Sequence, residues 1–480
     1  MSYGFKTKKF QIKPWHPYAW FIFAILAYSI AIVQTHPYRF IFLISIGCCC
    51  TILTIVVLLK CIKNPIIVQL GGFCWNEQDF CRGWLITGTT GSGKTASALN
   101  KIIDELCRNV PSWGGFVIDD KGLYWEKLYD SLKKRHLEDK LLLLKMDAAP
   151  SNKIQFMDLT VAPPSTYAKI LCDAAKACGQ DNANDSFFST QTQLFLENFI
   201  KLIALSKHTL QLSDCFKLLS DKTTFFETIQ PILVSNETHQ DALKCAQAFN
   251  AFWAQPDNQL GGVISTIYNF IAPFNTPLIT DLIHSNDPTH SLADIDKGKI
   301  ICISLPPPLE TERRYVHTLL KMCFYLHAMA RFSKTTQQRK SDNLLVFIAD
   351  EAQQIMNASS SSGLNDYEII AKIREAKATL IAATQSFVSL VPPLKEDVKA
   401  KVLMANLANR ISFKAADPES AHILSETFGK KKVFRGKANG IAHYDEVPAI
   451  SPQTLLHLKK FHAVIHHVEV GFDKVKLGPL

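Results

Sequence analysis

The sequence contains no CxxC pair, and its cysteines and histidines are nowhere grouped at the spacing of zinc ligands. A zinc site is therefore not indicated. The 13 cysteines are scattered through 480 residues, three of them consecutive at residues 48–50 inside an apolar run. We interpret them as reduced, mostly buried thiols that face a cytosol. No internal repeat is visible.

The overall composition is that of a folded protein. Hydrophobic residues make up 47% of the chain and charged residues 20%, which excludes wholesale disorder. The length suffices for a membrane anchor plus two or three globular units. The formal net charge of +9 suits anionic lipid, nucleotide or nucleic acid. A mildly basic solvated surface explains the charge equally well.

Two long uncharged runs, residues 15–34 and 40–59, lie near the N-terminus. Each has about 20 residues, enough to cross a hydrocarbon core of about 30 Å as a helix. Only residues 35–39 separate them, so we predict a transmembrane hairpin within residues 1–62. A cleaved signal peptide fits less well, because the first run is too long and a second run follows at once.

Lysines flank this hairpin on one side only. The short connection carries Arg39 alone, whereas lysines precede the first run and follow the second: Lys6, Lys8, Lys9, Lys13, Lys60 and Lys63. Positive residues stay preferentially in the cytoplasm, so we predict that both ends of the hairpin are cytoplasmic.

The rest of the chain alternates between strand-like and helix-like segments, which indicates a parallel α/β sheet. From 164 to 290 the pattern changes, because helical spacing of apolar residues dominates there, as at 187–205 and 242–253. We predict an all-helical insertion at 164–290 within an ATPase domain formed by 63–163 and 291–480. The predicted strands are residues 84–87, 115–118, 141–144, 299–305, 344–349, 379–383, 410–413 and 463–470.

A glycine-rich segment follows the first of these strands and fits the pattern GxxxxGK[ST] at every position. Its glycines allow successive backbone N–H groups to surround phosphates, and the helix predicted to follow directs its positive end at them. Lys94 is expected to reach the β- and γ-phosphates, and Thr95 to ligate Mg²⁺. The predicted ATP-binding residues are Gly88, Thr89, Thr90, Gly91, Ser92, Gly93, Lys94, Thr95 and Ala96.

Two acidic pairs follow strands and are candidates for the magnesium carboxylate. Asp119 and Asp120 follow the strand at 115–118, and Asp350 and Glu351 follow the more strongly apolar run at 344–349. The second pair places a carboxylate beside the magnesium ligand, where it can polarise the attacking water. We assign Asp350 to magnesium and Glu351 as the catalytic base, and interpret the first pair as a strand-end turn.

The strand at 379–383 ends in Thr384 and Gln385, a hydroxyl and an amide. At the end of a strand beside a nucleotide site, Gln385 could sense the γ-phosphate or the attacking water.

Arg374 lies 11 residues before Gln385. It is either a surface charge paired with Glu375 or an arginine finger directed at a neighbouring subunit.

The most basic segments lie farther on, at Lys430, Lys431, Lys432, Arg435 and Lys437 and at Lys459 and Lys460. Such runs are often solvated loops. Contact with the phosphates of a nucleic acid is the alternative.

The order of these motifs resembles that of type IV secretion coupling proteins, the TraD/TraG-like conjugation ATPases. The resemblance rests on the two apolar runs, the phosphate loop, VIDDKG at 117–122, DEA at 350–352, Arg374 and Gln385. NLANRI at 406–411 and DPESA at 417–421 follow in the expected order. The chain departs from the family pattern at Asp120, where proline is usual, and in the serine-rich loop at 359–362.

The resemblance implies a RecA-like motor with a helical insertion, assembled as a homo-hexamer on the bacterial inner membrane. It implies a catalytic role for Lys94, Glu351 and the sensor Gln385, and a finger role for Arg374 in the next subunit. It also implies that ATP hydrolysis drives the transfer of relaxase-bound DNA or protein effectors into a secretion channel. Two alternatives are an FtsK-type DNA motor and a membrane receptor that binds nucleotide without hydrolysing it.

Overall fold

The computed structural model describes residues 65–146, 152–180, 186–207, 209–358, 361–438 and 441–480. Both apolar runs of the predicted hairpin, and the first two residues of the serine-rich loop at 359–362, lie outside these ranges. Within them, no helix is both long and apolar enough to cross a bilayer.

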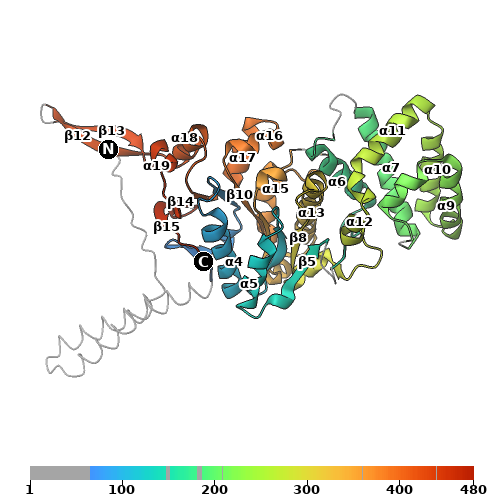
Figure 1. The fold of residues 1–480 in the computed structure, drawn as a ribbon, viewed down its shortest axis with the longest axis horizontal. Coiled ribbons are helices and arrows are strands. Elements are labelled where there is room, and N and C mark those ends of the chain that lie inside the picture. Colours follow the sequence, from blue (N-terminus) through green and yellow to red (C-terminus); the bar gives the residue numbers. More distant parts are fainter. Residues whose placement is uncertain (1–64, 147–151, 181–185, 208, 359–360, 439–440) are drawn as a thin grey trace, which may run out of the picture.

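A nine-stranded sheet forms the centre of the molecule (Figure 1). Its order is β15-β14-β11-β3-β10-β9-β4-β8-β5, and every neighbouring pair from β11 to β5 is parallel. At one side of the sheet, β14 (His462–His467) pairs antiparallel with β11, and the edge strand β15 (Gly471–Lys476) pairs antiparallel with β14. The parallel strands are β3 (Trp84–Thr87), β4 (Gly114–Ile118), β5 (Leu141–Lys145), β8 (Ile300–Ser304), β9 (Leu345–Ala349), β10 (Ala378–Thr384) and β11 (Asn409–Ser412).

Helices cover both faces of this sheet, as a parallel sheet requires. Successive residues of β9 point to opposite sides: Val346 and Ile348 join the core on one face, and Leu345 and Phe347 the core on the other. This alternation explains why β9 is apolar along its whole length. The first face is covered by α4 (Asn100–Asn109) and α5 (Tyr124–Lys133), and the second by α13 (Glu310–Ala330), α15 (Asp366–Ile373) and α17 (Asp397–Asn406).

A helical layer is inserted between two short strands that pair with each other in parallel, β6 (Ile154–Gln155) and β7 (His290–Ser291). It occupies one end of the long axis in Figure 1. Its helices are α6 (Pro164–Ala177), α7 (Ser186–Leu205), α8 (Cys215–Leu218), α9 (Lys222–Ser235), α10 (Gln240–Trp253), α11 (Asp257–Phe270) and α12 (Pro277–Ile283).

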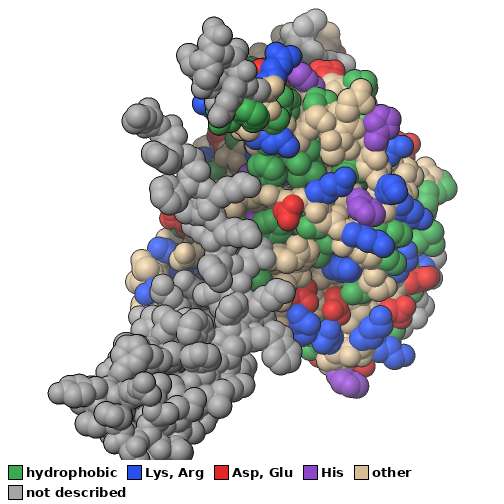
Figure 2. All heavy atoms as spheres, turned by 90° about the vertical axis from the view of Figure 1, so that its left-hand side faces the viewer, with side chains coloured by type: hydrophobic (Ala, Val, Ile, Leu, Met, Phe, Trp, Pro, Cys, Tyr) green, Lys and Arg blue, Asp and Glu red, His purple; other side chains and the backbone are tan. Residues whose placement is uncertain are grey.

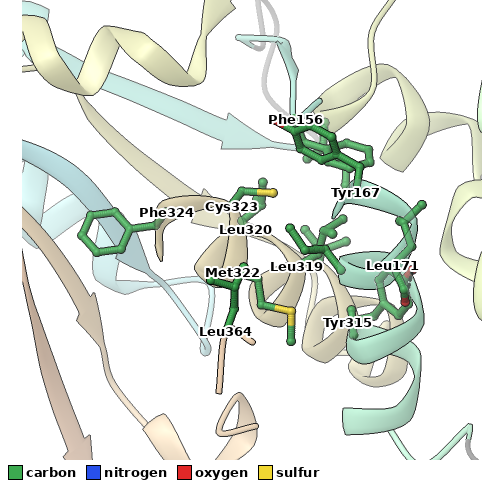
Figure 3. Close-up of a cluster of buried hydrophobic side chains, with 14 of the residues drawn as sticks. Phe156, Tyr167, Leu171, Tyr315, Leu319, Leu320, Met322, Cys323, Phe324 and Leu364 are labelled. Carbon is green, nitrogen blue, oxygen red and sulfur yellow. Dashed lines mark hydrogen bonds between the residues drawn. The ribbon is translucent and has the colours of Figure 1, made fainter. Parts of the chain in front are cut away.

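The helical layer and the sheet share one hydrophobic core. Tyr167 and Leu171 of α6 lie against Tyr315 and Leu319 of α13, the helix that packs on the sheet (Figure 3). All four side chains are at most 2% exposed. Full burial of each such side chain contributes about 1.5–3 kcal/mol, so this contact binds the inserted helices firmly to the domain that contains the sheet.

A buried ion pair fixes α13 to α15 on the same face. The ammonium of Lys321 lies 2.6 Å from the Asp366 carboxylate, and both side chains are fully buried. The Tyr325 hydroxyl donates a hydrogen bond to the same carboxylate at 2.6 Å. Removing one partner of such a pair costs about 3–5 kcal/mol, because the other charge is left buried.

Several strands besides β6 and β7 were not predicted from the sequence. β1 (Ile66–Leu70) and β2 (Phe73–Asn76) form a hairpin where no strand was predicted. β15 extends the sheet beyond the last predicted strand. β12 (Lys430–Ala438) and β13 (Ile441–Pro448) form a ribbon out of the basic segment. These strands are short or rich in charge, so their apolar alternation is weak.

Candidate nucleotide site

The loop at 88–93 turns sharply after β3. Gly88 and Gly93 have φ of 153° and 118°, conformations that favour glycine. Space alone would also demand glycine. A Cβ on Gly88 would lie 2.6 Å from Cβ of Phe413, and one on Gly93 would lie 2.7 Å from Cδ1 of Phe461. The loop is thus enclosed by the strands that flank β3 and by the turn before β14.

The helix that follows the loop begins at Lys94. Its first turns, Lys94–Leu99, are a π-helix that continues into α4. The Lys94 side chain is buried, and its ammonium donates a hydrogen bond to the carbonyl of Gly88 at 2.6 Å. Burial lowers the pKa of Lys94, and the nearby carboxylates of Glu351 and Asp350 oppose this shift.

Asp350 lies at the end of β9, directly opposite the start of this helix. The Thr95 hydroxyl donates a hydrogen bond to its carboxylate at 2.9 Å. Burial raises the pKa of Asp350, the Glu351 charge raises it further, and the bond from Thr95 lowers it. The structure therefore brings together the two oxygen ligands that the sequence assigned to magnesium. Such oxygen donors are the kind that Mg²⁺ prefers.

Glu351 has a left-handed backbone, with φ of 53°, which is rare outside glycine. Its carboxylate accepts hydrogen bonds from the amides of Gln353 at 2.9 Å and of Gln385 at 3.4 Å. Lys121 forms an ion pair with it at 3.3 Å. Burial would raise the pKa of Glu351, but the Gln353 bond and the charges of Lys121 and Lys94 together lower it. The predicted sensor Gln385 therefore contacts the predicted base.

The other acidic pair has partners of its own. The fully buried Asp119 carboxylate accepts the backbone N–H groups of Leu123, Tyr124 and Trp125 at 2.9–3.2 Å. It also accepts the Ser304 hydroxyl at 3.2 Å. Asp120 forms an ion pair with Arg313 at 3.3 Å. Asp119 thus secures the start of α5, in agreement with its interpretation as a strand-end turn.

A cavity of about 240 Å³ lies between the loop, the acidic pair and the turn before β14. Sequence reasoning missed three of its lining residues: Lys121, Lys460 and Phe461. Lys121 could have been found, because it belongs to the strand-end motif at 117–122. Lys460 and Phe461 lie more than 360 positions from the loop, and no local pattern indicates that the fold returns there.

Arg374 is not part of this site. It lies before β10, and Gln385 follows β10, so the strand holds the two residues at opposite ends of the sheet. Arg374 lines a different cavity of about 450 Å³ with the basic residues Arg82, Arg339, Lys340 and Lys377. In its own chain, therefore, Arg374 does not reach the nucleotide site.

The family model for conjugative DNA transfer by the type IV secretory system matches residues 54–439. The chain belongs to this family. The resemblance to coupling proteins stated above is confirmed, and the match favours that assignment over an FtsK-type motor. No curated protein matches the sequence.

Solved structures of a conjugative coupling protein share the fold. Unbound TrwB, a bacterial conjugative coupling protein, superposes with a TM-score of 0.61 at 16% identity, covering 86% of this chain and 88% of that one. The complex of the plasmid coupling protein TrwB with ADP and Mg²⁺ gives a TM-score of 0.63 at 15% identity, with coverages of 86% and 89%. The TrwB complex with a non-hydrolysable ATP analogue matches at 16% identity with a TM-score of 0.60 and coverages of 86% and 89%. At identities this low, the likeness shows only that the chain shares the α/β fold of TrwB.

Proposed function

We propose that this member of the conjugative DNA transfer family binds ATP with Mg²⁺ and hydrolyses it to drive substrate transfer. The observation that carries the proposal is the bond between Thr95 and Asp350, with Glu351 and Gln385 beside it. A receptor that only binds nucleotide has no need of a second carboxylate at this place. The TrwB complexes with ADP and Mg²⁺ and with an ATP analogue support the choice of ligands.

In this proposal each residue has a defined task. The loop N–H groups and the Lys94 ammonium bind the phosphates. The Thr95 hydroxyl and the Asp350 carboxylate hold Mg²⁺, which supplies charge neutralisation of the phosphates when bound. Glu351 accepts a proton from the attacking water, and the bonds from Gln353 and Gln385 keep its carboxylate aimed at the cavity. Gln385 is then placed to respond to the γ-phosphate.

Release of phosphate from ATP by the purified chain tests this proposal. We expect hydrolysis that stops when EDTA removes Mg²⁺ and a loss of ATP binding in Lys94→Ala. Binding of ATP without phosphate release, with and without DNA, would favour the non-hydrolysing receptor instead.

We further propose that residues 1–62 anchor a homo-hexamer in the bacterial inner membrane, where it meets the secretion channel. The apolar runs at 15–34 and 40–59 and the one-sided lysines support this topology. The division into a motor at 63–163 and 291–480 and a helical insertion at 164–290 is part of the same proposal. A reporter fused at His36 should score as periplasmic. A chain without residues 1–62 should be soluble and still bind ATP, whereas a cytoplasmic score at His36 would overturn the topology.

We propose that the β12–β13 ribbon contacts the DNA that is transferred. Lys430, Lys431 and Lys432 are exposed on it, and the exposed rings of Phe434 and Tyr444 lie 5.7 Å apart. The ribbon projects at the end of the long axis opposite the inserted helices (Figure 1). Figure 2 views that end, and Lys and Arg side chains are spread over its described surface. Phosphates attract the lysines, and exposed rings offer faces on which bases can stack.

DNA binding measured against salt concentration tests the role of the ribbon. Replacement of Lys430, Lys431 and Lys432 by glutamine should reduce the slope of log binding constant against log salt concentration by about two to three units. The control replaces two exposed lysines of α5, Lys127 and Lys133, and the exposed Lys134 that follows it, and should leave the slope unchanged. DNA should also stimulate ATP hydrolysis. Equal slopes for the two triple variants would exclude the ribbon, and a lack of stimulation by DNA would indicate protein effectors as the substrate.

A further inference from the structure

The turn that precedes β14 is fixed to the phosphate loop and to the edge of the sheet at once. The Phe461 N–H donates a hydrogen bond to the carbonyl of Ser92 at 2.9 Å, and the Phe461 carbonyl accepts one from Leu477 at 2.7 Å. Phe461 has φ of 63°, a conformation that a bulky side chain adopts only when its surroundings impose it. The structure thus maintains strain at a residue that faces the nucleotide cavity.

The side chains of this turn line the same cavity as the acidic pair. The Phe461 ring lies so close to Gly93 that a Cβ there would come within 2.7 Å of it. The Lys460 ammonium lies 5.1 Å from the centre of that ring, and both residues line the cavity. Its neighbour Lys459 is equally exposed but is not among the lining residues.

We propose that Lys460 and Phe461 form the second wall of the nucleotide site, with Lys460 binding the polyphosphate and Phe461 packing against the nucleoside. This inference rests on the proposed function, since it assigns residues to the same ligand. The polyphosphate of ATP carries several negative charges. Lys94 supplies a cation from the loop, and the other lysine near it, Lys121, is paired with Glu351. Lys460 supplies a further cation from the turn before β14, with an exposed side chain that can move with the phosphates.

The position of Lys460 also separates it from the basic ribbon. In the sequence, Lys459 and Lys460 are part of the positive segments considered for nucleic acid. In the structure, Lys460 shares a cavity with Lys94, Thr95 and Asp350. In that cavity the anionic partner expected for Lys460 is the polyphosphate of ATP, and not the phosphates of DNA bound to the ribbon.

Calorimetric titration in a magnesium buffer tests the inference with two probes, ATP and inorganic tripolyphosphate. Lys460→Gln should weaken the binding of both by about tenfold, because it removes one charge-assisted contact to phosphate. The matched control Lys459→Gln should bind both like the wild type. Phe461→Leu should weaken ATP by about fivefold and leave tripolyphosphate unchanged, since only ATP carries a nucleoside.

The outcomes distinguish this inference from the proposed function. If the wild type binds no ATP, the proposed function fails. If Lys94→Ala loses ATP while Lys460→Gln keeps wild-type affinity for both probes, only the second wall is overturned. Equal losses of DNA affinity in Lys459→Gln and Lys460→Gln, with ATP affinity unchanged, would overturn it in favour of a DNA surface. Thermal melting of each variant separates loss of a contact from loss of the fold.

Discussion

The two ends of the parallel sheet carry different chemistry. At the carboxyl end, Thr95, Asp350, Glu351 and Gln385 form one connected set of hydrogen bonds. At the amino end, Arg374 lies among exposed or half-exposed basic residues and two glutamates, Glu77 and Glu375. Parallel strands place every residue that follows a strand at one end and every residue that precedes a strand at the other. One chain can therefore assemble the site but cannot bring its own Arg374 to it.

The two ends also differ in how firmly their side chains are held. Glu351 is 8% exposed and has three side-chain partners. The amino-end pair of Lys377 and Glu77, at 3.3 Å, has side chains that are 22% and 40% exposed. Partly exposed ion pairs of this kind contribute about 0–1 kcal/mol. The carboxyl end is organised in advance, whereas the amino end retains the freedom to meet another surface.

Of the variants considered, Arg374→Ala is expected to reduce turnover most, and only when the subunits are assembled. If the amino end of one subunit completes the site of the next, kcat should fall by about 10³–10⁵ under conditions where hexamers form. ATP affinity of the single chain should not change. Arg339→Ala, in the same cavity, is the matched control and should leave kcat near its normal value. An assembled Arg374→Ala variant with normal kcat would assign Arg374 to the surface, paired with Glu375.

Glu351→Gln should reduce turnover by about 10²–10⁴ while ATP still binds, because the amide cannot accept a proton. Single-turnover phosphate release and ATP titration measure the two quantities separately. Asp120→Asn tests the other acidic pair and should hydrolyse ATP at a rate close to that of the wild type. If Glu351→Gln kept wild-type turnover and Asp120→Asn lost it, the catalytic base would have to be assigned to the first acidic pair, Asp119 and Asp120.

Asp119→Asn should affect stability more than catalysis. The substitution removes a charged acceptor from the N–H groups that open α5, so the free energy of unfolding should fall by about 1–3 kcal/mol. Urea unfolding measures this change. The magnesium concentration for half-maximal ATPase activity should remain the same, and a marked increase in it would make Asp119 a metal ligand after all.

Glu77→Gln should give the smallest effect, a loss of at most about 1 kcal/mol of stability with normal ATP binding. It removes the partner of Lys377 at the amino end. Denaturant midpoints of the assembled and dissociated protein should shift alike. A larger shift in the assembled protein alone would show that this end is already part of a subunit contact.

The strands and the phosphate loop could be predicted from the sequence because their signals are local. The run at 344–349 is apolar throughout since β9 is buried on both faces, and the loop pattern demands glycines wherever backbone must turn. That Gln385 lies near Glu351 could be predicted only from the fact that both residues follow strands.

Lys460 and Phe461 could not be predicted as part of the site. β14 comes close to the loop through pairing with β11, a long-range contact with no local signature in the sequence. The basic ribbon was missed because its charges obscure the alternation of its strands.

The shared core of α6 and α13 constrains how this family can evolve. β6 and β7 lie side by side, so the chain leaves the α/β domain and returns to it at nearly the same place. The entropy cost of closing such a loop rises only slowly with its length, so the number of residues in this detour matters little. Parts of the detour that do not contact α13 can therefore be lengthened or shortened without disturbing the sheet. The face of α6 that carries Tyr167 and Leu171 has no such freedom, because α13 needs it. Among relatives, we therefore expect variation to be low on this face of α6 and higher in the parts of the detour that do not contact α13.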